Sequence, residues 1–331
     1  MSIFSKIILN TAIGAVLIII WLQFVNINQI LQTLSKVNPA SLLPIFIFMF
    51  ISPVIRALRL KIFLKDIQKI PLLDLISLNG AAMMLNFFIP IRAGEFAKGV
   101  YLNNRYNLPL AKSVVWIFLD RFVDLLVIIL LAAIMVALLP TSLPSGFSKS
   151  AWLIFIIALS LSYISIFKSD FALKIVNFLN TLLIEKHIKI YFNRFSHFIL
   201  DSLRILNRHP KDLFLLAVTT ILAYGADAAI FYFTFLAVSK PQDFLIMYLA
   251  QLLSALTYII PAAPGYVGSA EASGLLIFSG IFGIEANLAS ATIVLFHVLT
   301  VIFVLLFGIT SIYFLKINVG DFAKKILKRE K

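Results

Sequence analysis

The stretch "NFFIPIRAGEFAKG", residues 86–99, interrupts an apolar region with a proline and then with three charged residues. Pro90 ends the apolar run, and Arg92, Glu95 and Lys98 follow at three-residue intervals. Because proline does not continue a helix from the preceding turn, the chain must restart a helix after it. Residues three apart then lie on one face of the new helix. The pattern predicts two short helices joined at a break, with charges gathered where the second begins.

The composition around this stretch is that of an all-α polytopic membrane protein. Hydrophobic residues make up 61% of the 331, and only 13% are charged, whereas about a quarter are charged in soluble domains. Cysteine is absent, which excludes a disulfide framework and thiolate sites. Apolar stretches long enough to cross a bilayer recur. They predict about six full spans, at residues 7–25, 41–60, 109–139, 151–168, 211–238 and 286–316.

A second break resembles the first. Residues 244–283 run apolar to "TYIIP", break at "AAPGYVGS" and resume as "AEASGLLIFSGIFG". "IPIRAG" (89–94) and "IPAAPG" (260–265) share Ile-Pro and a glycine four residues after the proline. We interpret 72–104 and 244–283 as re-entrant helical hairpins. Each is followed by a long span, as in an inverted repeat whose broken helices meet near the midplane.

Basic residues set the expected orientation. The basic segments 56–69, 168–211 and 316–331 should all be cytoplasmic. An even number of crossings must separate any two of them. This requires the first hairpin to enter from the cytoplasm and the second from outside. Only Lys36, Lys149 and Lys240 then fall outside.

These assignments define the expected organisation of the chain in a prokaryotic inner membrane, with both termini cytoplasmic. Its net charge of +13 favours anionic lipid headgroups at the cytoplasmic face, rather than nucleic acid, as partners. Residues 170–209 are expected to form amphipathic helices on the inner interface. The expected parts are a single transmembrane domain (1–331), a first repeat (72–139), the interfacial segment, a second repeat (244–316) and a basic tail (317–331).

The first hairpin is a candidate anion site. Helix N-termini leave unpaired N–H groups and partial positive charge, and a guanidinium can grip a phosphate with two parallel hydrogen bonds. We therefore expect Arg92, Gly94, Glu95 and Lys98 to contribute to substrate binding. The alternative is an internal Arg92–Glu95 pair that only satisfies the break.

A second group of charges lies in "FLDRFVDLL". Asp120, Arg121 and Asp124 fall near the middle of the span at 109–139. Charges at this depth must face protein or water, and they commonly mark a transport pathway. Two interpretations stay open: a substrate site, or a structural ion-pair cluster that holds Arg92.

The second hairpin carries Gly265, Gly268 and Glu271, its only charge. The glycines allow close backbone approach. A carboxylate buried among apolar helices tends to hold a proton, so Glu271 is a candidate coupling site, with protons moving opposite to the substrate. His297 in the next span could shuttle the proton, although both residues could instead have packing roles. Asp227 is expected to face the outer interface.

These residues carry a resemblance to a family. The chain resembles the flippase-like transmembrane domain of lysylphosphatidylglycerol synthases and its stand-alone relatives. The matching motifs are Pro90-Ile-Arg92-Ala-Gly94-Glu95, Asp120-Arg121-Phe-Val-Asp124, and Pro264-Gly265-Tyr-Val-Gly268 with Glu271. Asp120 stands where glutamate is commoner, and "FHVLT" replaces a segment that often carries arginine. The soluble aminoacyl-transferring domain is missing, so aminoacyl transfer is not expected.

The resemblance implies movement of a phospholipid or a polyprenyl-phosphate lipid between leaflets. On this interpretation Gly265 and Gly268 join the substrate-binding residues, and no catalytic residue, cofactor or metal is expected. One alternative is a membrane transferase acting on polyprenyl-phosphate sugars, in which Asp120 and Asp124 would hold Mg²⁺. Another is an accessory membrane subunit.

Overall fold

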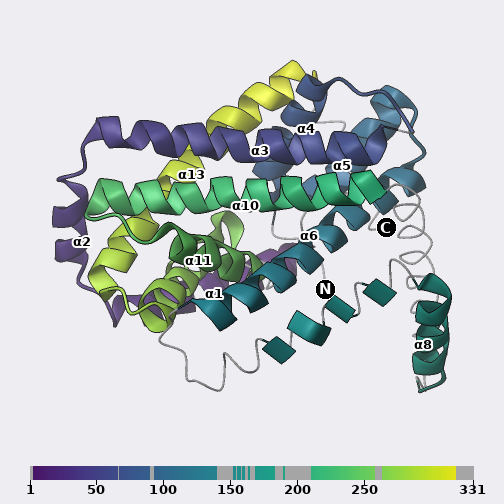
Figure 1. Ribbon diagram of the computed structural model, residues 1–331. Coiled ribbons are helices and arrows are strands. Elements are labelled where there is room, and N and C mark those ends of the chain that lie inside the picture. The colour runs from purple at the N-terminus through teal and green to yellow at the C-terminus, as the bar shows by residue number, and fades with distance from the viewer. Residues whose placement is uncertain are drawn as a thin grey trace.

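The computed structural model is helical and contains no strand over the residues that it describes (Figure 1). These are 3–65, 67–89, 93–139, 168–182, 210–257 and 263–317, with short pieces within 152–164 and at 189–190. The helices are α1 (Ile3–Leu22), α2 (Ile27–Leu34), η1 (Pro39–Leu42), α3 (Leu43–Leu64), α4 (Leu72–Phe88), α5 (Ala93–Tyr106), α6 (Leu110–Leu138), α8 (Ser169–Leu182), α10 (Pro210–Val238), α11 (Phe244–Thr257), η2 (Pro264–Tyr266), α12 (Ser269–Leu275), the π-helical η3 (Leu276–Ile281) and α13 (Ala286–Phe314). The expected all-α class is confirmed.

Several of these helices are long and apolar enough to cross a membrane. Within the described residues, Pro39–Leu64, Lys211–Val238 and Ala286–Phe314 qualify by length and composition. A fourth span arises if α1 and α2, bent by 90° at residues 23–26, count as one. The protein is therefore a multi-pass membrane protein. Six full spans remain a prediction, since much of 151–168 lies outside the described residues.

The first break produces two antiparallel helices. Near the break, Gly94 of α5 packs so closely on α4 that an added Cβ would lie 2.0 Å from the carbonyl oxygen of Ala82. At the far ends, the Tyr106 hydroxyl donates to Asp74 Oδ2 at 2.5 Å. The chain thus turns back on itself between α4 and α5. Its return to the same membrane face remains a prediction.

The two breaks meet in space. Phe87, at the end of α4, packs its ring on Tyr266 of η2, with centroids 5.8 Å apart. A Cβ added to Gly265 would contact the same ring at 3.4 Å. The elements beside the two breaks are therefore in contact through Phe87, and the inverted repeat itself stays a prediction.

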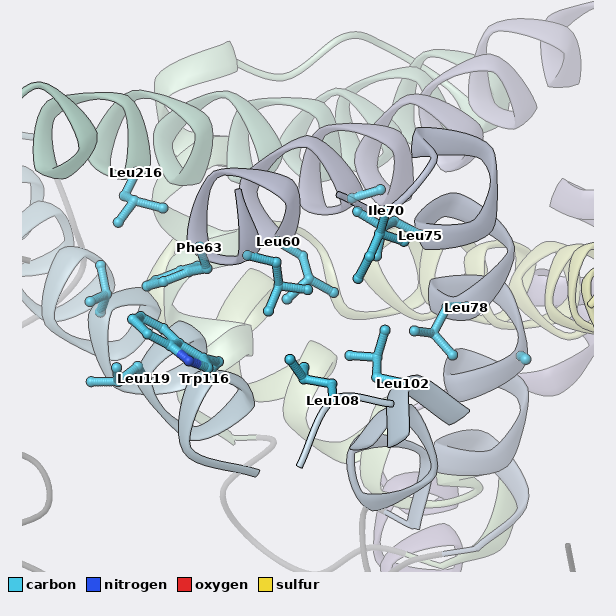
Figure 2. Packing of buried hydrophobic residues seen from close by; sticks show 14 of the residues in the cluster. Leu60, Phe63, Ile70, Leu75, Leu78, Leu102, Leu108, Trp116, Leu119 and Leu216 are labelled. Carbon is cyan, nitrogen blue, oxygen red and sulfur yellow. The ribbon is translucent and has the colours of Figure 1, made fainter. Parts of the chain in front are cut away.

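An apolar cluster holds α3 against the first hairpin and α6 (Figure 2). Phe63 of α3 faces Trp116 of α6, with ring centroids 6.0 Å apart. Leu60 and Leu119 of the same cluster are fully or almost fully buried. Because Leu60 follows Arg59 and Leu119 precedes Asp120, this packing sets the polar side chains of the two helices beside each other.

The structure corrects the expected boundary of the first basic loop. Arg56 and Arg59 were assigned to a cytoplasmic loop at 56–69, but α3 continues to Leu64 and contains both. Apolar residues on both sides of Arg59 keep the helix packed against α10, beside which it runs in Figure 1. The expected loop therefore begins only after Leu64, and the side of the membrane on which the basic residues lie stays a prediction. The interfacial segment 170–209 begins with α8, and most of its remainder lies outside the described residues.

Labelling of single cysteines tests the orientation of the first hairpin. Asn104, in the last turn of α5, is exposed, and the protein has no native cysteine. We expect Asn104→Cys to react with a membrane-impermeant maleimide only from the cytoplasmic side, and Lys36→Cys only from outside. Labelling of Asn104→Cys from outside would contradict the re-entrant topology.

Candidate functional site

Arg59 lies at the centre of a buried ion network. Its side chain is only 1% exposed. Nε and Nη2 donate to the two carboxylate oxygens of Asp120, at 2.7 and 3.1 Å. Nη1 donates to Asp124 Oδ1 at 2.5 Å and to Thr220 Oγ1 at 2.9 Å. One guanidinium therefore joins α3, α6 and α10, and such fork geometry suits arginine rather than lysine.

Arg56, one turn earlier on the same helix, forms a second ion pair. Its Nη2 donates to Asp227 Oδ2 at 2.6 Å, and its guanidinium carbon lies 4.9 Å from the centre of the Tyr224 ring. The Tyr224 hydroxyl donates to Asp124 Oδ2 at 3.2 Å, which links this pair to Arg59. The expectation that Asp227 faces the outer interface is wrong, because α10 packs along α3 and turns this carboxylate toward Arg56.

Glu95, Lys98 and Arg121 connect the first hairpin to α6. Lys98 Nζ lies 3.3 Å from Glu95 Oε2. Arg121 lies 2.9 Å from Asp120 and 3.5 Å from Asp124, but its Nε is 3.8 Å from Glu95 Oε1. That Nε makes no hydrogen bond within the described residues. Arg121 is 30% exposed and is the most loosely held guanidinium of the network.

The charges of this network balance among the described residues. Four cations face four carboxylates: Arg56, Arg59, Lys98 and Arg121 with Glu95, Asp120, Asp124 and Asp227. Charges at membrane depth are tolerated only when paired in this way. An incoming anion must therefore compete with a carboxylate for a cation. An anion loses the least free energy in this competition at Arg121, because the contact between Arg121 and Glu95 is long.

The segment around the second break contributes a separate polar contact. His297 of α13 lies with Nδ1 2.6 Å from Glu271 Oε1 and Nε2 2.7 Å from the carbonyl oxygen of Gly265. The N–H of Gly268 donates to Glu271 Oε2 at 2.7 Å. The sequence predicted Glu271 and His297 as coupling residues on separate helices. In the structure α13 packs on α12 and brings the two side chains into contact.

Residues of both polar groups line one cavity of about 520 Å³. This volume lies within the range of small-molecule sites. Its charged or titratable lining residues are Arg56, Glu95, Lys98, Arg121, Asp124, Asp227, Tyr224, Tyr266 and His297. Its apolar lining includes Met49, Met83, Phe87, Phe122, Leu125, Ile128, Ile230, Phe296, Phe303 and Val304.

The predicted site residues fall into three groups around this cavity. Glu95, Lys98, Arg121, Asp124 and His297 line it, while Asp120 and Glu271 lie directly behind lining residues. The three predicted glycines do not line the cavity but allow the backbone to pack closely on its neighbours. Gly94 packs on α4, Gly265 on Phe87, and Gly268 on α1.

Arg92 lies outside the described residues. Asn86 and Phe87 before it and Glu95 after it line the cavity. The start of α5 was expected to offer unpaired N–H groups to an anion. The N–H of Gly94 there already donates to Asn86 Oδ1 at 2.8 Å.

Sequence reasoning missed Arg56, Arg59 and Asp227 as site residues. A signal for the arginines was present, since Leu60, Ile62, Phe63 and Leu64 continue the apolar pattern beyond them. An arginine inside such a pattern lies within a span, where it needs a partner.

The magnesium alternative meets a geometric obstacle. Asp120 and Asp124 are both engaged by Arg59, so their oxygens are occupied by N–H donors. Mg²⁺ needs only one or two carboxylates beside a substrate phosphate, but each of these two carboxylates already has an arginine as its partner. The arrangement therefore favours binding of an anion by cations over its binding through a metal.

Comparison with known proteins places the chain in a family. Residues 7–308 match the model of the lysylphosphatidylglycerol synthase transmembrane region. The chain belongs to this family. No curated protein and no solved structure matches the sequence. The matched residues include every site residue described above. The family indicates a membrane function related to lipids.

Proposed function

We propose that the protein is a lipid transporter of the flippase type. The cavity holds the phosphate-bearing headgroup of a phospholipid or a polyprenyl-phosphate lipid, and the hydrocarbon tails stay in the bilayer. The observation that carries the proposal is the loosely held guanidinium of Arg121 in a cavity of about 520 Å³, with Lys98 beside it. The lipid-related family supports the same class of substrate.

The ion network suggests how a headgroup is bound. A phosphate oxygen approaches the exposed edge of Arg121 and takes the place of Glu95, which retains Lys98 as its partner. Arginine suits this task because its planar fork matches phosphate. Arg59 stays saturated by two carboxylates and a hydroxyl and holds the helices that carry the site.

The two breaks provide the parts that move. Alternating access in transporters with broken helices arises when one repeat rocks against the other around a central site. Here the only described ring contacts of Phe87 outside its own hairpin are to Tyr266 and His297 of the second repeat. We place this exchange in the inner membrane of a prokaryote, with both termini cytoplasmic.

Replacement of Arg121 tests the function. Hydrogen bonds to charged groups contribute about 1.5–3 kcal/mol, so Arg121→Gln should slow lipid movement about 10- to 100-fold. Arg121→Lys keeps the charge but lacks the planar fork of arginine. Its rate of lipid movement should lie between the rates of Arg121→Gln and wild type. The measurement is reconstitution into vesicles that contain phosphatidylglycerol with an NBD-labelled acyl chain, followed by dithionite quenching of the outer leaflet.

Lys65→Gln is the matched control, because it removes a cation whose side chain is 44% exposed and lies outside the cavity. Its rate should equal that of wild type. Size-exclusion profiles establish that each variant is folded. Lipid movement at the wild-type rate in folded Arg121→Gln, or none in the wild-type protein, would overturn the proposal.

A further inference from the structure

The contact between Glu271 and His297 fixes how many protons the pair holds. The Gly265 carbonyl oxygen can only accept, so Nε2 of His297 must carry a hydrogen at 2.7 Å from it. Nδ1 then faces Glu271 Oε1 at 2.6 Å. Without a hydrogen between them, a ring lone pair would face a carboxylate lone pair at this distance. The geometry therefore requires one proton between Nδ1 and Oε1.

That proton makes the pair electrically neutral. On Nδ1 it gives an imidazolium beside a carboxylate, and on Oε1 it gives a neutral imidazole beside a carboxylic acid. Both forms have zero net charge. Loss of the proton to the cavity leaves one negative charge on the pair.

The pair lies where the cavity and the second hairpin meet. His297 lines the cavity, and Glu271 lies behind it in α12. The same two side chains hold the backbone of Gly265 and Gly268 at the break. A change in the protonation of this pair therefore alters the contacts that tie the hairpin tip to α13.

No other described charged side chain contacts the pair. Around it, α4 contributes the ring of Phe87, 6.4 Å from that of His297, and α1 contributes Gly14 against Gly268. Tyr266 of η2 is the neighbouring titratable group that lines the cavity. The other described charged residues that line the cavity belong to the ion network of α3, α5, α6 and α10.

We propose that the Glu271–His297 pair binds the proton that is carried together with the lipid phosphate. This proposal rests on the proposed function and adds the identity of the coupling ion. The charges of the network balance among the described residues, and a bound phosphate adds negative charge to the cavity. That charge opposes loss of the proton from the pair, and by linkage the proton strengthens phosphate binding by the same factor.

The predicted cycle is electroneutral co-transport. For a phospholipid such as phosphatidylglycerol, the phosphate diester carries one negative charge and the pair contributes one proton, which is released to water on the far side. Charge balance thus favours movement in the same direction, rather than the opposite movement that the sequence alone suggested. Because no net charge moves, the membrane potential should have no effect.

The experiment measures the steady-state leaflet distribution of NBD-labelled phosphatidylglycerol in vesicles with a gradient of one pH unit. One proton per lipid predicts about a tenfold accumulation in the leaflet on the alkaline side. Glu271→Gln and His297→Gln should lose this asymmetry. Glu285→Gln is the matched control and should keep it, because Glu285 is exposed and caps α13 outside the cavity.

A second measurement does not depend on lipid movement. In the ¹⁵N-histidine protein, which has four histidines, the proton between Nδ1 and Oε1 should give a strongly downfield resonance that both variants lose. Absence of this resonance in wild type overturns the proton site. A symmetric distribution in wild-type vesicles that do move lipid overturns the coupling and leaves the flippase function standing. Absence of any lipid movement overturns both.

Discussion

Arg59→Met is expected to lower the free energy of unfolding by about 3–5 kcal/mol, the usual cost of removing one partner from a buried ion pair. Arg59 donates to Asp120 and Asp124, and methionine would leave both carboxylates without their main cation. Arg121 and Arg56 contact them at 2.9–3.7 Å and replace only part of the loss. Equilibrium unfolding in mixed detergent micelles, followed by circular dichroism, measures the change.

Two comparisons isolate the cause. Lys65→Met removes an exposed partner of Asp212 and should cost less than about 1 kcal/mol. Combining Arg59→Met with Asp120→Asn and Asp124→Asn removes the uncompensated charges and should recover part of the stability. A loss below 1 kcal/mol in Arg59→Met would show that the network does not hold α3 to α6.

Gly268→Ala is expected to destabilise the protein by about 3 kcal/mol or more. Gly268 has φ +83°, where a residue with a Cβ is strained by about 1–3 kcal/mol. The added Cβ would also lie 2.1 Å from the carbonyl oxygen of Gly14. Relief of that overlap moves α1 away from α12, at the further cost of about 1–3 kcal/mol typical of overpacking. The same unfolding measurement reports the loss.

Gly225→Ala provides the matched comparison in α10. Its added Cβ would approach only Tyr248, at 3.4 Å, and alanine is the better helix former by about 1 kcal/mol. We expect its stability to equal or exceed that of wild type. Equal stability of Gly268→Ala and wild type would contradict the close packing of α1 on the second hairpin.

Local patterns in the sequence were sufficient for the class of the protein and for the helices around its breaks. The apolar runs predicted α3, α6, α10 and α13 to within a few residues, because a helix in lipid satisfies its own backbone within one segment. Pro90 separates α4 from α5, as expected of a residue that lacks an N–H. The sequence also placed Glu95 and Lys98 on one helix face at i, i+3 spacing, and they form an ion pair in the structure.

The centre of the site was decided by tertiary structure alone. Arg59 and Asp120 are separated by 61 positions, and Arg56 and Asp227 by 171. Helical periodicity shows which face of a helix is polar, but not which other helix covers that face. The pairing of α3 with α6 and α10, and of α12 with α13, depends on how apolar side chains of distant segments interlock. That packing brings His297 into contact with Glu271, and it makes Arg56 and Arg59, expected in a loop, into cations of the site.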